Sequence, residues 1–127
     1  MQYPEVLERI LARAGVRDPG EAADLVRAVL TALEERTTPG LARNLRSQLP
    51  EELKAAVPEV PGQALGGGAD AFLRRVVDLR GRATPPQAVR GTLDVLREAV
   101  SPGQIENLLG QLPEDLDRLV GGPGVRD

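Results

Sequence analysis

The chain has 127 residues, a formal net charge of −3, and no histidine or cysteine. Its length favours a single domain with a core of its own, and its charge gives no overall attraction to nucleic acid. Without cysteine there is no disulfide or thiolate chemistry, and without histidine the commonest general base and metal ligand is missing. We therefore expect a protein that is not an enzyme and binds no cofactor or transition metal.

Hydropathy gives no sign of membrane association. No apolar run approaches the roughly 18 residues that a membrane-spanning helix requires. The first ten residues, MQYPEVLERI, lack the basic flank and short apolar core of a secretory signal. We expect a cytoplasmic protein.

Taken in chain order, the first half predicts four helices. Apolar residues at helical spacing run from Val6 to Ala14, and Gly15 is a typical helix end. Asp18-Pro19 predicts an N-cap followed by proline at the first helical position, and the second apolar stripe continues to Leu33. Thr38-Pro39 repeats this start signal for a third helix, and Pro50 opens a short fourth one.

A proline- and glycine-rich stretch at 58–68, PEVPGQALGGG, predicts a linker. After it, a stripe beginning at Phe72 ends near Gly81, and Thr84-Pro85 starts a helix that continues to Val100. Ser101-Pro102 and Pro113 open two further helices. Residues 122–127 are expected to be a disordered tail.

The two halves are copies of each other. QLPEEL at 48–53 matches QLPEDL at 111–116 at an offset of 63, and Glu35 matches Glu98 at the same offset. Further upstream the offset becomes 66, where Arg9 matches Arg75. The sequence predicts an all-α, single compact domain over 1–121, formed by two pseudo-symmetric four-helix repeats at 3–57 and 69–120. One copy alone would be marginally stable, so we expect the two to share one core about a pseudo-twofold axis.

The repeated QLP corner has two interpretations. Asn44 and Gln48 are four residues apart and share one face of the third expected helix, where the glutamine amide can bond the corner's backbone. This structural role explains the repetition without a ligand. The alternative is a pair of related polar pockets formed by four amides: Asn44, Gln48, Asn107 and Gln111.

A basic stretch lies at 71–97, which contains six arginines and two aspartates and so has a local net charge of +4. Such a stretch can bind nucleic acid or an acidic protein. The competing interpretation is a solvated face on which Arg74, Asp78 and Arg82 alternate in sign. The arginines concerned are Arg74, Arg75, Arg80, Arg82, Arg90 and Arg97.

The adjacent acids do not predict a catalytic pair. Neighbouring helical residues point about 100° apart, so neither Glu34-Glu35 nor Glu51-Glu52 forms a facing carboxylate dyad. We expect Glu34-Glu35 on a solvated helix face and Glu51-Glu52 at a helix start. A Mg²⁺ or Ca²⁺ site made of carboxylates alone stays open, although the spacing of an EF-hand loop is absent.

The segments 6–16 (VLERILARAGV), 28–40 (AVLTALEERTTPG) and 48–53 (QLPEEL), with their second-half echoes at 72–81, 92–103 and 111–116, resemble a bacterial family catalogued as domain of unknown function 2267. The resemblance implies a small, all-helical, duplicated fold, and it brings no activity, catalytic residue or cofactor. The leading hypothesis is a helical module that binds a protein partner or self-associates. Nucleic-acid binding through 71–97 is the alternative, and a small-molecule function would need a polar pocket between the copies.

Overall fold

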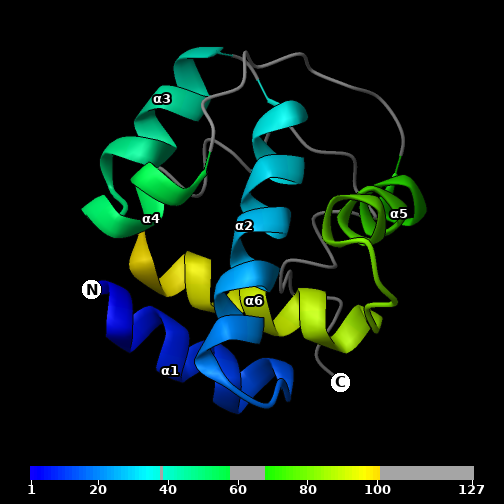
Figure 1. Ribbon diagram of the computed structural model, residues 1–127. Helices are drawn as coiled ribbons and strands as arrows, with labels where there is room; N and C mark the ends of the chain where they lie inside the picture. Colours follow the sequence, from blue (N-terminus) through cyan, green and yellow to red (C-terminus); the bar gives the residue numbers. More distant parts are fainter. Residues whose placement is uncertain (38, 58–67, 101–127) are drawn as a thin grey trace.

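The computed structural model describes residues 1–37, 39–57 and 68–100, apart from the side chain of residue 41. These residues form helices joined by short turns and contain no strand, which confirms the all-helical prediction for this part of the chain (Figure 1). The helices are α1 (Tyr3–Ala14), α2 (Pro19–Glu35), α3 (Pro39–Ser47), α4 (Glu51–Ala56), α5 (Ala69–Arg80) and α6 (Pro86–Ala99).

Several predicted helix ends are confirmed by the backbone. α1 ends at Gly15, with φ 71°, and α5 ends at Gly81, with φ 72°. Both glycines are left-handed, a conformation that costs a residue with a Cβ additional free energy. At the start of α2, the Asp18 carboxylate accepts a 2.9 Å hydrogen bond from the backbone N–H of Glu21. These three signals act locally, so they could be identified without knowledge of the tertiary structure.

Two helix starts differ from the prediction by one residue. α6 begins at Pro86, because Pro85 is the N-cap with an extended backbone, φ −65° and ψ 147°. A proline forces the preceding residue out of the helical region, so Pro86 prevents Pro85 from being the first helical residue. The hydroxyl of Thr84, predicted to cap this helix, instead bonds Arg80 and the carbonyl of Arg82. Pro50 is likewise an extended N-cap, and α4 begins at Glu51.

The helices of the two halves are interleaved. α2 runs through the middle of the molecule, with α1 and α6 crossing near its first half and α5 on one side (Figure 1). α1 packs mainly on α6, and α5 packs mainly on α2. The α1–α6 crossing is close, since a Cβ added at Gly91 would lie 2.6 Å from the carbonyl oxygen of Arg13.

One hydrophobic cluster contains residues from both halves, including Ile10, Leu25 and Leu53 from the first and Phe72 and Leu93 from the second. All five are 2 % exposed or less. Tyr3 is partly buried and packs against this cluster. None of the described helices is long and apolar enough to cross a membrane.

Several predictions lie outside the described residues. They are the caps at Thr38 and Ser101, the linker except for Gly68, the two helices expected after Ser101, and the tail at 122–127. Gly68 itself is the N-cap of α5.

Candidate functional site

The C-terminal end of α2 carries four consecutive polar residues that are buried. Glu34 is fully buried, and Glu35, Arg36 and Thr37 are 6, 7 and 1 % exposed. The prediction that Glu34 and Glu35 lie on a solvated face is therefore wrong. α2 is central, so its last turn meets α5 on one side and the α3–α4 corner on another.

Glu35 is paired with an arginine from the second half. Nε and Nη2 of Arg75 on α5 donate to the two carboxylate oxygens of Glu35 at 2.9 and 2.8 Å. The two parallel bonds form a bidentate pair, the strongest common geometry for these groups. Hydrogen bonding to Glu35 raises the pKa of Arg75 above its usual value. This pair joins α2 to α5 beside the core.

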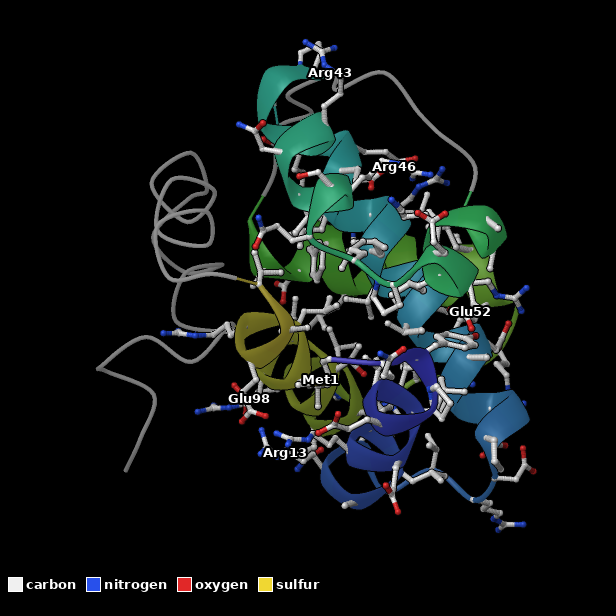
Figure 2. The ribbon with its side chains drawn as sticks, turned by 90° about the vertical axis from the view of Figure 1, so that its left-hand side faces the viewer. Met1, Arg13, Arg43, Arg46, Glu52 and Glu98 are labelled. Atoms are coloured by element: carbon white, nitrogen blue, oxygen red, sulfur yellow. The ribbon has the colours of Figure 1, made fainter. Side chains whose placement is uncertain are left out.

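Glu34 is neutralised by Arg46 of α3, whose Nη1 lies 3.3 Å from the carboxylate. Nη2 of the same arginine donates to the backbone carbonyls of Lys54, at 2.9 Å, and Val57, at 3.0 Å. Figure 2 shows the Arg46 side chain among α3, α4 and α2. Arg46 therefore attaches the α3–α4 corner to α2.

Arg36 lies at the same end of α2, and in the described part of the chain it has no acidic partner of this kind. Among the described residues, its Nε and Nη1 and the hydroxyl of the neighbouring Thr37 are buried without a hydrogen-bond partner. The guanidinium carbon lies 5.5 Å from the ring centre of Phe72. Burial lowers the pKa of Arg36, while the nearby Glu35 carboxylate raises it.

The contacts of Arg36 within this cluster do not offset the free-energy cost of burying its charge. Burying an ion with no partner costs several kcal/mol after relaxation. A cation–π contact returns about 0.5 to 2 kcal/mol, and a cation at a helix C-terminus about 0.3 to 1 kcal/mol. Neither contact supplies hydrogen-bond acceptors for Nε and Nη1.

A second ion-pair cluster lies between α1 and α6. Nη1 of Arg9 donates to Glu98 at 2.7 Å, and Arg13 donates to the other oxygen of the same carboxylate (Figure 2). Hydrogen bonding to Arg13, and then to Arg9, lowers the pKa of Glu98. Arg9 and Glu98 occupy the positions equivalent to Arg75 and Glu35 at offsets of 66 and 63. Equivalent residues thus form the α1–α6 and α5–α2 ion pairs.

An apolar groove of about 410 Å³ lies beside α1 and the start of α2. It is lined by Pro4, Leu7, Leu11 and Pro19, with Glu8 as its charged residue. Leu7 and Leu11 are only partly buried. The groove falls in the size range of sites that bind an apolar ligand or side chain.

A smaller hollow of about 160 Å³ lies where the α1–α2 and α5–α6 loops meet, between the two halves. Its charged lining includes Glu21, Arg80 and Arg82. Arg80 bonds Asp24 at 3.0 Å, and Arg82 lies 3.4 Å from Glu21. The hollow is below the roughly 300 Å³ of typical ligand pockets, so it gives little support to a small-molecule function.

The amides singled out in the sequence lie at the surface or outside the described residues. Asn44 on α3 and Gln48 just after it are both exposed. The Asn44 carbonyl accepts a 2.7 Å hydrogen bond from the Ser47 hydroxyl. Asn107 and Gln111 lie outside the described residues. The polar-pocket alternative therefore stays a prediction.

The arginines of 71–97 do not share one environment. Arg75, Arg80 and Arg82 contact acids on α2, as described above. Arg74 on α5 is exposed, whereas Arg90 and Arg97 on α6 are partly buried. Three of the six positive charges are thus compensated by α2, and whether the stretch binds nucleic acid stays untested.

Neither Arg36 nor Arg46 was among the candidate residues predicted from the sequence. A signal for both was present in the comparison of the two halves. At an offset of 63, Arg36-Thr37 corresponds to Ala99-Val100 and Arg46 to Leu109. A charged residue whose counterpart 63 positions later is apolar was the sequence signal that set these two arginines apart.

Comparison with protein families matches residues 3–119 to the family described as "Uncharacterized conserved protein (DUF2267)". The match spans both halves and includes all six described helices. No curated protein matches the chain significantly.

Proposed function

Because the chain belongs to domain of unknown function family 2267, and because that family brings no activity with it, we propose a function from the surface: a non-enzymatic helical module that binds an apolar helix of a protein partner or of a second copy. The groove on α1 carries this proposal. The absence of histidine and cysteine supports a role without catalysis. Among the described residues, no three histidine, cysteine, aspartate or glutamate side chains are grouped to hold a metal ion.

The chemistry of the groove suits a helix. Leu7 and Leu11 are one helical turn apart, and Pro4 and Pro19 extend the apolar surface at either end. A partner helix would place apolar residues at i, i+3 and i+4 against this surface. Glu8 at the margin favours a partner with a lysine or arginine beside its apolar stripe.

A pseudo-twofold relation between the halves is part of the proposal. It is supported by two ion pairs, Arg9–Glu98 and Arg75–Glu35, in which the arginine of each half pairs with the equivalent glutamate of the other half. Gly15 and Gly81, which are also equivalent, end α1 and α5 with almost the same φ. Two four-helix repeats at 3–57 and 69–120 would generate this pattern.

Nucleic-acid binding is the less favoured function. The ion pairs of Arg75, Arg80 and Arg82 with α2 already use half of the arginines that would form the basic surface. The chain has only two aromatic residues, Tyr3 and Phe72. Phe72 is fully buried and cannot stack on a base. Gel-shift titration at low salt tests this function directly.

The groove can be tested with a matched pair of variants. Leu7→Asn places a polar amide in the groove, and Leu73→Asn makes the same change at the equivalent position of α5. Both leucines are partly buried against the core, so both variants should lose similar stability, roughly 1 to 2 kcal/mol. Only Leu7→Asn should weaken association.

Two measurements complete the test. Sedimentation equilibrium over a range of concentrations detects a second copy as the partner. Capture from host cells, with wild type and both variants as baits, detects a different protein. A complex kept by Leu73→Asn and lost by Leu7→Asn supports the proposal. Equal retention of every complex by both variants, or a strict monomer that captures nothing, contradicts it.

A further inference from the structure

We propose that the end of α2 is an oxyanion-binding site in which Arg36 and Thr37 bind a carboxylate or phosphate group. The site is distinct from the α1 groove, since Arg36 lies about 25 Å along α2 from Pro19. It rests on the unpartnered donors at this position and not on the interaction function. Arg36 is 93 % buried, and three polar atoms of Arg36 and Thr37 have no partner among the described residues.

The charges around Arg36 indicate the sign of the ligand. Glu34 is paired with Arg46, and Glu35 is paired with Arg75. Each of these carboxylates thus has its own arginine partner, and within the described residues Arg36 forms no ion pair. The guanidinium stays protonated at any physiological pH and can only donate hydrogen bonds. A water molecule could accept those bonds, but only an anion also compensates the charge.

The second half of the chain acts as an internal control. Arg36, Thr37 and Phe72 correspond to Ala99, Val100 and Val6 at offsets of 63 and 66. At the equivalent helix contact, small apolar residues therefore occupy the positions that correspond to the Arg36 guanidinium and the Phe72 ring beside it. Helix packing at those positions needs no polar side chain. We therefore infer that Arg36 and Thr37 have a role other than helix packing.

The donors also define the ligand's chemistry. Two guanidinium nitrogens, Nε and Nη1, and one hydroxyl lie on adjacent residues at the end of α2. Carboxylate and phosphate oxygens accept such donors in short, charge-assisted bonds. The two ligand classes share this chemistry, and separate probes distinguish them.

Thermal unfolding with inorganic phosphate or with acetate, each against chloride at equal ionic strength, tests the site. The key variant is Arg36→Ala/Thr37→Val, which gives the first half the apolar pair of the second. Thr37→Val alone is a milder second variant. Arg43→Ala is the control, because Arg43 is an exposed arginine on the neighbouring α3 (Figure 2).

One of the two probes should raise the melting temperature of wild type and Arg43→Ala in a saturable manner, and so identify the class of anion. The double variant should lose about tenfold or more in affinity for that probe, and Thr37→Val should lose less. In wild type, the Arg36 Nε–H resonance should shift along the same isotherm. The proposal is overturned if neither probe stabilises wild type beyond chloride. It is also overturned if the double variant responds as wild type does.

Discussion

Gly91→Ala tests the close crossing of α1 and α6. The added Cβ would lie 2.6 Å from the carbonyl oxygen of Arg13, 2.7 Å from its carbonyl carbon and 2.9 Å from the backbone nitrogen of Ala14. All three atoms belong to the backbone of α1, so no side chain can rotate away. Ordinary contact begins at 3.4 Å, and the helices would have to separate by about 0.8 Å at this point.

Two effects of Gly91→Ala oppose each other. Alanine stabilises a helix interior by about 1 kcal/mol relative to glycine. Overpacking of a well-packed contact costs about 1 to 3 kcal/mol, and the upper end applies because the obstacle is backbone. We expect a net loss of about 1 to 2 kcal/mol, which lowers the melting temperature by about 4 to 8 °C for a chain of this size.

Differential scanning calorimetry measures the effect, and two variants separate its causes. Gly40→Ala on α3 meets no atom within 4 Å and should leave the melting temperature unchanged or slightly higher. Ala28→Gly, at the position of α2 equivalent to Gly91, removes a methyl group and should cost about 1 kcal/mol through helix propensity. A melting temperature of Gly91→Ala at or above that of wild type would show that the close contact with α1 does not limit stability.

Three further predictions concern individual polar contacts. Glu35→Gln should lower the free energy of unfolding by roughly 2 kcal/mol, because the Glu35 side chain is only 8 % exposed and its carboxylate accepts two bonds from Arg75. Glu98→Gln, at a side chain that is 36 % exposed, should lower it by less than about 1 kcal/mol in urea unfolding at neutral pH. Equal losses for the two variants would contradict the role of burial. Because Arg13 lowers the pKa of Glu98 in the folded state, the stability that Glu98 adds should be full above its unfolded pKa of about 4.3 and disappear as the pH falls through the folded value. A difference between wild type and Glu98→Gln that grows on acidification would disprove this linkage. Asp18→Ala removes the N-cap of α2 and should cost about 1 kcal/mol by urea unfolding; no measurable loss would show that the cap contributes nothing.

The parts of the fold that sequence predicted are those encoded within a few residues. The Asp18-Pro19 start and the Gly15 and Gly81 ends depend on the backbone preferences of the residues themselves. The one-residue error at α6 is of the same local kind. Two consecutive prolines at 85–86 allow only the second to begin the helix, so the error was avoidable from sequence.

The polar cluster at the end of α2 was not predictable in the same way. An adjacent pair of glutamates on a helix is normally solvated, and the last turn of α2 itself contains no basic residue. The partners of Glu34 and Glu35 are arginines 12 and 40 residues away along the chain. Only the packing of α5 and of the α3–α4 corner around α2 reveals that these carboxylates are buried.

Comparison of the two halves separates the requirements of the fold from additional features. Two identical pairs have structural roles in the described residues: Gly15 and Gly81 end helices, and Arg9 and Arg75 form interhelical ion pairs. Their repetition is explained by helix packing without a ligand. Arg36 differs from these residues, because the residue 63 positions later is Ala99 and because, within the described parts of the chain, its Nε and Nη1 have no hydrogen-bond partner. On our proposal that the end of α2 binds an anion, the ligand would supply both the missing acceptors and the compensating charge.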